Sequence, residues 1–188
     1  MKEKKIIKDS FKRHLDAFSK VNICIPEIIK SSSLINDAVH SGSKILIAGN
    51  GGSASDAQHF AAEFIGRFVK ERKSFPAISL STDTSAITAI SNDYGYENVF
   101  SRQIDGLGKK GDIFIGISTS GNSENIIMAI KKSKEIGLKT ITLTGNDGGK
   151  MKTISDFNIN IADSETARIQ EVHIFILHIF CQLFEHDF

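Results

Sequence analysis

The most informative segment of the chain is Ile113-Phe114-Ile115-Gly116-Ile117-Ser118-Thr119-Ser120-Gly121-Asn122-Ser123-Glu124-Asn125. An apolar run leads into a hydroxyl-rich segment and then into a helical pattern, which predicts a buried strand, a turn and a helix N-terminus. Free N–H groups and the helix dipole attract an anion at such a place. One interpretation is a phosphate cradle; the other is an ordinary turn capped by Ser120 or Asn122, with Gly121 at a positive φ angle. The hydroxyls of the cradle would come from Ser118, Thr119, Ser120 and Ser123.

Outward from this stretch, strand-like runs alternate with helical patterns. Strands are expected at Lys44–Ala48, Ala77–Leu80, Asp112–Ile117, Lys139–Leu143 and Phe157–Ile161. Helices are expected at about Ala54–Lys70, Thr84–Ser91, Asn98–Leu107, Ser123–Ile136 and Ala167–Glu185. This order predicts an α/β fold with a five-stranded parallel sheet and helices on both faces. Ligands of such sheets bind at the carboxyl ends of the strands, so the loops after the strands are candidate sites.

Two more helices, roughly Glu3–Lys20 and Ile23–His40, come before the first strand and are apolar along one stripe. We expect them to pack on the flank of the sheet or on another subunit. The lysine-rich start could be a basic arm, but the helical spacing of Ile6, Ile7 and Phe11 favours a helix. The 188 residues contain no linker or repeat, which predicts one domain over residues 1–188, including the leading helices within 1–42.

Composition excludes several classes of function. Lys and Arg number 23 against 22 Asp and Glu, a net charge of +1, which gives no global footprint for nucleic acid. Cys24 and Cys181 are too far apart in sequence to indicate a disulfide framework or a thiolate metal site. No apolar run approaches the ~20 residues of a membrane helix. We therefore expect a soluble, cytoplasmic protein without nucleic-acid or membrane partners.

The loop after the first strand, Gly49-Asn50-Gly51-Gly52-Ser53-Ala54, fits the G-x-G-x-x-A form of a dinucleotide fingerprint. The acidic residue that should follow about 20 residues later is missing, because Asp83 lies too far along the chain. Two interpretations remain: a glycine turn that brings backbone close to a ligand, with Asn50 and Ser53 as polar contacts, or a tight turn only.

The segment Thr144–Lys150 looks like a Walker phosphate loop at first sight. Its glycines, Gly145 and Gly149, are one residue too close for that motif, and Met151 stands where a Ser or Thr is required. We interpret it as a structural loop after the fourth strand.

His59 and Glu63 lie four residues apart on the helix that the glycine loop opens, and Arg67 continues that spacing. A histidine and a carboxylate on one face can bind a metal or divide acid and base roles, and an arginine can grip a phosphate. The alternative is a surface stripe in which Glu63 pairs with Arg67. The position beside a ligand loop favours the functional interpretation.

The last helix is apolar on almost every face, which implies burial in the domain or at a subunit interface. Gln170, His173 and His178 must find polar partners there. His173 lies about 60° from Gln170 around the helix and His178 about 80° on the other side, so periodicity does not choose between the histidines. Asn92 and Asp93, after the second strand, could bind sugar hydroxyls or end a helix.

Taken together, these motifs resemble the sugar isomerase (SIS) domain family and, more narrowly, the bacterial phosphoheptose isomerases. The resemblance spans nearly the whole chain, including the leading helices. It rests on Gly49–Ser53, His59-x-x-x-Glu63, Asn92-Asp93, Ser118–Ser123, Leu143–Gly145 with Asp147–Gly149, and Arg168-Ile169-Gln170-Glu171. Ala167 departs from relatives that have an acidic residue at that position.

The resemblance implies conversion of sedoheptulose 7-phosphate to D-glycero-D-manno-heptose 7-phosphate through an enediol, as the entry to ADP-heptose for lipopolysaccharide or related surface glycans. It implies a homotetramer with active sites at subunit boundaries and a bound zinc ion. It implies Glu63 and His178 as the catalytic pair, and thus chooses His178 over His173. The implied substrate contacts are Asn50, Gly51, Gly52, Ser53, His59, Glu63, Arg67, Asn92, Asp93, Ser118, Thr119, Ser120, Ser123 and Gln170.

The implied zinc ligands are His59, Glu63, Gln170 and His178. Gln170 and His178 are separated by a helical rise of about 12 Å, so we expect ligands from different subunits to share the metal. The alternative function is that of a sister branch of non-catalytic adaptors that bind the replication initiator. Its members share the Arg-Ile-Gln-Glu run but lack the glutamate and histidine that this chain has as Glu63 and His178.

Overall fold

The computed structural model describes residues 2–186, and its centre is one sheet of five parallel strands in the order β2-β1-β3-β4-β5. The strands are β1 (Ile45–Gly49), β2 (Ala77–Ser79), β3 (Ile113–Ser118), β4 (Lys139–Gly145) and β5 (Phe157–Ile161). Each begins and ends within two residues of the predicted position. The predicted parallel α/β architecture is therefore confirmed.

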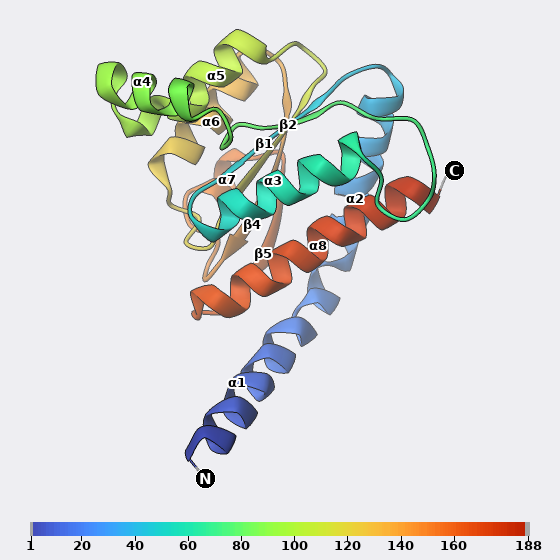
Figure 1. Cartoon of the computed structure of the whole chain (residues 1–188), viewed down its shortest axis with the longest axis vertical. Helices are drawn as coiled ribbons and strands as arrows, with labels where there is room; N and C mark the ends of the chain where they lie inside the picture. The colour runs from blue at the N-terminus through green and yellow to red at the C-terminus, as the bar shows by residue number, and fades with distance from the viewer. Residues whose placement is uncertain (1, 187–188) are drawn as a thin grey trace.

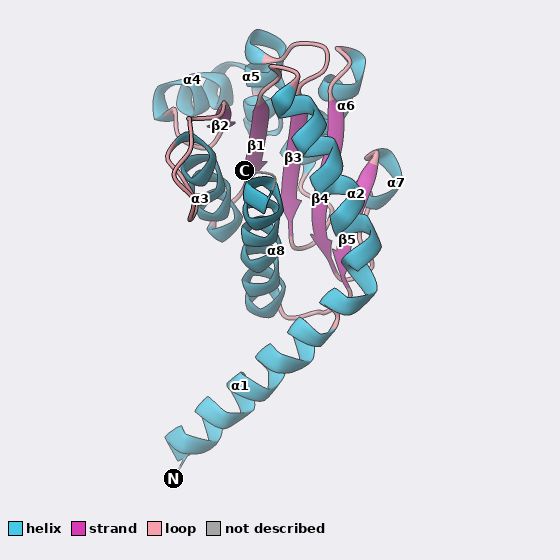
Figure 2. Ribbon diagram, turned by 90° about the vertical axis from the view of Figure 1, so that its right-hand side faces the viewer, coloured by secondary structure: helices cyan, strands magenta, loops and turns pink. Residues whose placement is uncertain are grey.

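Two layers of helices cover the sheet (Figures 1 and 2). Alternate strand residues face opposite layers: Ile45 and Ile47 belong to one apolar cluster, and Leu46 and Ala48 to the other. The first cluster contains residues of α2 (Val21–His40), α3 (Gly52–Ile65) and α8 (Thr166–His186). The second contains residues of α5 (Val99–Leu107), α6 (Glu124–Glu135) and α7 (Met151–Ile154), with α4 (Thr84–Tyr94) against it. The 3₁₀ turn η1 (Tyr96–Asn98) joins α4 to α5.

Three helix predictions differ from the structure. Helix α3 covers Gly52–Ile65 where Ala54–Lys70 was expected, because Gly66 ends it and the chain then turns toward α8. Helix α4 continues three residues beyond Ser91 to Tyr94, before Gly95 at a φ of 86°. The short helix α7 lies beyond the fourth-strand loop, where no helix was expected.

Helix α1 (Lys2–Ser19) extends away from the body of the domain (Figures 1 and 2). Its apolar stripe is exposed in the single chain, at Ile6, Ile7, Phe11 and Leu15. Polar contacts join its middle to the start of α8, with Arg13 2.9 Å from Glu165 and His14 2.8 Å from Glu171. Of the two leading helices, α2 packs on the sheet as expected, whereas the apolar stripe of α1 stays uncovered.

Within residues 2–186 no helix has the length and apolar character needed to cross a bilayer. Both cysteines, Cys24 and Cys181, are buried and free.

Candidate active site

The candidate site lies where the strand order reverses, between the neighbouring strands β1 and β3. Ile47 pairs with Ile115 and Gly49 with Ile117, so the loops after both strands leave the sheet at the same edge. One reciprocal amide pair joins them: Asn50 donates to Asn125 at 3.0 Å, and Asn125 donates back at 2.8 Å. The glycine loop and the hydroxyl-rich loop therefore form one continuous surface.

The loop after β3 exposes some hydroxyls and fixes others. Ser118 is buried, and its Oγ lies 2.8 Å from that of Ser123 and 3.3 Å from that of Ser120. Ser123, not Ser120 or Asn122, is the N-cap of α6, and its side chain makes no capping hydrogen bond. Thr119 is half-buried and Ser120 is exposed. The loop thus presents hydroxyls at a helix N-terminus, the arrangement that binds a phosphate.

The Walker-like segment Thr144–Lys150 supports this loop from the side. The backbone N–H of Lys150 donates to the side-chain oxygen of Asn122 at 3.0 Å, and Asn146 donates to the carbonyl of Thr119 at 3.2 Å. A Cβ on Gly121, whose φ is 65°, would lie 2.1 Å from the carbonyl oxygen of Gly148. The segment acts as a structural support, as its broken motif indicated.

In the glycine loop, the glycines permit close packing of backbone against other groups. A Cβ on Gly49 would lie 2.5 Å from the carbonyl oxygen of Ser53, and one on Gly52 would lie 2.2 Å from the Gln170 amide nitrogen. Gly51, at a φ of 55°, is the N-cap of α3. The first turn of α3 therefore lies in contact with Gln170 of α8.

His59, Glu63 and His178 meet between α3 and α8. The Nε2 atoms of the two histidines are 2.9 Å apart, and Nε2 of His59 lies 3.2 Å from a carboxylate oxygen of Glu63. Burial and the charge of His59 lower the pKa of His178, whereas Glu63 raises it, and the net direction is down. His178 is therefore mainly neutral at neutral pH and can either accept or donate a proton.

His173 has a different role from His178. It is completely buried, its Nε2 lies 3.0 Å from the carbonyl oxygen of Thr144, and burial lowers its pKa to about 4. A neutral imidazole hydrogen-bonded to a strand carbonyl is a core residue. The structure thus separates the two histidines that helix periodicity left equivalent.

Gln170, the fourth expected metal ligand, packs against the first turn of α3. It lies against Gly52 at the start of α3, together with the carboxyl group of Asp56. Within residues 2–186, no three His, Cys, Asp or Glu side chains form a group that could hold a metal ion. The zinc site expected from the resemblance stays a prediction.

Asp56 is a buried carboxyl group that the sequence analysis missed. Only 7% of it is exposed, and its Oδ2 has no hydrogen-bond partner within the described residues. Burial raises its pKa to about 6, while a side-chain hydrogen bond from Gln170 and the charge of His59 act in the opposite direction. Its spacing of seven residues before Glu63 places it on the same helix face and could have indicated it.

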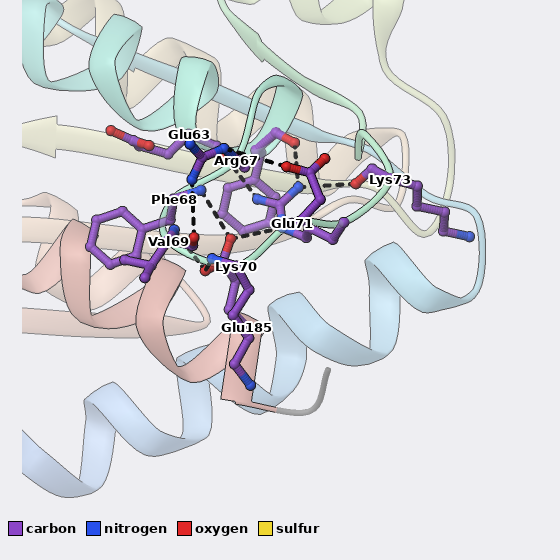
Figure 3. Close-up of polar contacts among 10 residues, drawn as sticks. Glu63, Arg67, Phe68, Val69, Lys70, Glu71, Lys73 and Glu185 are labelled. Atoms are coloured by element: carbon purple, nitrogen blue, oxygen red, sulfur yellow. Dashed lines mark hydrogen bonds and ion pairs between the residues drawn. The ribbon is translucent and has the colours of Figure 1, made fainter.

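Arg67 does not continue the face of His59 and Glu63, which corrects the sequence prediction. Helix α3 ends at Ile65, and Arg67 lies on the segment that follows (Figure 3). Its guanidinium donates to the carbonyl of Val69 at 3.0 Å and lies 3.7 Å from a carboxylate oxygen of Glu71. Arg67 is exposed, so its substrate role stays a prediction.

Asn92 and Asp93 lie on the last turn of α4, and both are exposed. Asn92 donates to Asp93 at 2.8 Å, so the pair ends a helix. Tyr96, just beyond them, reaches the site by donating to the side-chain oxygen of Asn50 at 2.9 Å. A contact of Asn92 or Asp93 with substrate stays a prediction.

Comparison with known proteins identifies the class of protein. Residues 9–145 match the sequence model of the SIS domain. The phosphoheptose isomerase of Helicobacter pylori strain P12 is 53% identical over 184 residues, 97% of this chain and 96% of that protein. The chain belongs to the SIS domain family and, within it, to the phosphoheptose isomerases.

Two solved structures show the same fold over nearly the whole chain. The phosphoheptose isomerase of Neisseria gonorrhoeae is 41% identical with a TM-score of 0.92, covering 97% of this chain and 98% of that one. That of Francisella tularensis is 33% identical with a TM-score of 0.95, covering 99% and 100%. The similarity includes the leading helices as well as the sheet.

Proposed function

We propose that this protein converts sedoheptulose 7-phosphate to D-glycero-D-manno-heptose 7-phosphate. The observation that carries the proposal is the contact of His59 on α3 with both Glu63, on the same helix, and His178 on α8. Helix α3 starts from the glycine loop, which Asn50 joins to Asn125 beside the phosphate-type loop. An aldose–ketose isomerase needs a base, an acid and an anchor for the phosphate. Membership of the phosphoheptose isomerases supports the heptose as substrate.

The reaction moves one proton between neighbouring carbons. In this mechanism the carboxylate of Glu63 removes a proton from C1 of the ketose, which gives an enediol, and the proton returns to C2 to form the aldose. His178 moves protons between the two oxygens, a role that suits an imidazole that is mainly neutral. Ser118, Thr119, Ser120 and Ser123 hold the phosphate at the far end of the sugar.

The family also implies zinc, and we propose that His59, Glu63, Gln170 and His178 hold it. Two imidazole nitrogens and a carboxylate are typical zinc ligands. Nε2 of His59 lies close to Nε2 of His178 and to a carboxylate oxygen of Glu63, but the three do not form a metal-binding group within the described residues of the single chain, so the proposal requires the assembled subunits. Because Gln170 packs at the start of α3, we expect it to reach a metal held by another subunit. A bound zinc would polarise the substrate carbonyl. Metal analysis of purified protein, with Gln170→Ala for comparison, tests the proposal.

We propose a homotetramer with active sites at subunit boundaries. The exposed stripe on α1 and the exposed side chains of Arg67, Asn92 and Asp93 support it, because each is available to a second chain. Light scattering during size-exclusion chromatography would give the mass. Phe11→Asp is expected to lower that mass, and an unchanged mass would contradict a role for α1.

We further propose a cytoplasmic enzyme whose product enters ADP-heptose synthesis for surface glycans such as lipopolysaccharide. The non-catalytic adaptor is the second candidate, but the presence of Glu63 and His178, both in contact with His59, favours an enzyme. Turnover of sedoheptulose 7-phosphate by purified protein, followed by product chromatography, decides between them. Turnover supports the isomerase; its absence, together with binding of the replication initiator, would support the adaptor.

A further inference from the structure

The segment that follows α3 has no regular secondary structure, yet one buried carboxylate fixes it (Figure 3). Glu185 of α8, whose side chain is 4% exposed, accepts hydrogen bonds from three consecutive backbone N–H groups. Its oxygens lie 2.9 Å from the nitrogens of Phe68 and Val69 and 2.8 Å from that of Lys70. The loop therefore has a fixed attachment point on α8.

The same carboxylate binds a buried arginine. Nε of Arg72 lies 3.0 Å from an oxygen of Glu185, and the side chain of Arg72 is 3% exposed. Burial alone would raise the pKa of Glu185, but the hydrogen bonds from Lys70, Val69, Phe68 and Arg72 lower it. The carboxylate of Glu185 is therefore ionised at neutral pH and forms a buried ion pair with the guanidinium of Arg72.

The remaining nitrogens of Arg72 bind the end of helix α3. One donates to the carbonyl of Glu63 at 2.7 Å, and another donates to the carbonyl of Phe64 at 3.0 Å. The last carbonyls of a helix have no partner within it, and a cation is favourable at that end. Arg72 thus caps the helical turn that contains Glu63.

The pair also connects the two helices of the candidate active site. Glu185 lies seven residues after His178 on α8, about two helical turns. Arg72 holds the backbone of Glu63 on α3. The distance between Glu63 and His178 therefore depends on the Arg72–Glu185 contact as well as on the packing of the two helices.

We propose that Arg72 and Glu185 are positioning residues for the isomerase reaction, which fix the backbone of Glu63 against α8 so that its carboxylate stays beside His59 and His178. The inference rests on the proposed function. The phosphate loop lies on other elements, so it is not affected. Loss of the pair should therefore lower kcat and leave substrate binding nearly intact.

The test compares Glu185→Gln and Arg72→Lys with the wild type in turnover of sedoheptulose 7-phosphate, per folded molecule. In Glu185→Gln we expect kcat to fall about 10- to 100-fold, since a displacement of about 1 Å can cost that much, with KM changed less than about threefold. Arg72→Lys keeps the positive charge but loses the planar guanidinium that reaches the carbonyls of Glu63 and Phe64. We expect kcat of this variant to fall about tenfold. Hydrogen exchange at the amides of residues 68–70 should become faster in Glu185→Gln.

The matched control is Asp112→Asn, in the residue before β3, which bonds the segments that lead into β1 and β3 and, within the described residues, has no hydrogen bond to α3 or α8. Asp112 is likewise buried, pairs with Lys44 and accepts backbone hydrogen bonds from Lys44 at 3.0 Å and Lys109 at 2.8 Å. We expect a lower melting temperature in this variant, with wild-type kcat and KM per folded molecule.

Three results would overturn the inference: wild-type kcat in the folded variants, a rise in KM at constant kcat, or an equal loss of kcat in Asp112→Asn. Should Glu185→Gln fail to fold, Arg72→Lys decides alone. Absence of turnover in the wild type would instead refute the proposed function, so the two failures are distinguishable.

Discussion

The loop after β3 and the cluster between α3 and α8 are built in opposite ways. Ser118 and Ser123, which share a hydrogen bond, are five residues apart in sequence, whereas His59 and His178 are 119 apart. The hydroxyls of the first site come from one strand, one turn and one helix start, with support from the neighbouring loop after β4. The cluster between α3 and α8 forms only when these two helices pack in one relative position. A local site should therefore respond to changes in its own backbone, and an assembled site to changes at distant contacts.

Glu63→Gln should have the largest effect, in the assembled site. The amide keeps the shape of the side chain but cannot remove a proton, so we expect kcat to fall about 10³-fold with little change in KM. The measurement is steady-state turnover of sedoheptulose 7-phosphate. Glu71→Gln, with a side chain that is 91% exposed, is the control and should behave as the wild type. Unchanged turnover in Glu63→Gln would refute the mechanism.

Gly121→Ala should have the next largest effect, in the local site. A Cβ there would lie 2.1 Å from the Gly148 carbonyl oxygen at a φ of 65°. The backbone must shift to remove this overlap, and alanine is strained at this φ. Together these effects should lower folding stability by about 3 kcal/mol and raise KM about tenfold. Denaturant unfolding and kinetics measure both. Gly42→Ala has a φ of 87° but open space around the Cβ, so it should cost only about 1 kcal/mol. Equal costs would show that packing against Gly148 contributes nothing.

Asp56→Asn tests a buried group of the assembled site through pH. The folded-state pKa of about 6 lies above the ordinary value for Asp, so the unfolded chain ionises first as pH rises. The free energy of unfolding of the wild type should therefore decrease between about pH 4 and pH 6 and remain at the decreased value above that range. Asn cannot ionise, so the variant should be about 1–3 kcal/mol more stable than the wild type near pH 7. The difference in stability between the variant and the wild type should vanish at about pH 4. Urea unfolding of both proteins at about pH 4 and about pH 7 measures it, and an equal difference at the two pH values would contradict the raised pKa of Asp56.

Ser120→Ala should have the smallest effect, because it removes one of several groups that can bind the phosphate. Its exposed hydroxyl would contribute one hydrogen bond to the phosphate, so KM should rise about three- to tenfold with kcat nearly constant. Ser33→Ala, on α2 and bonded to its own helix at 3.1 Å, is the control. A fall in kcat at constant KM would argue against an anchoring role for the loop after β3.

Sequence patterns predicted the fold well because strand and helix signals are local. Alternating apolar residues such as Leu46 and Ile47 face two different helix layers, and the Ser118–Ser123 loop is continuous in sequence. The end of α3 was predicted too late in the chain: Gly66 ends the helix, and Glu185, more than 110 residues later, binds the backbone of Phe68 and Val69 beyond it. No local pattern contains that contact. For the same reason Arg67 was placed on the wrong element.

Local patterns and motifs in a fixed order were enough to predict the parallel α/β fold, the hydroxyl-rich loop at the start of α6, and the family. Three features required the folded structure: His178 faces His59 while His173 lies in the core, Gln170 packs beside Asp56, and Arg72 caps α3. Turns and periodic patterns depend on neighbouring residues, which the sequence states directly. Contacts between helices depend on how the sheet brings distant segments together, and that geometry exists only in the folded chain.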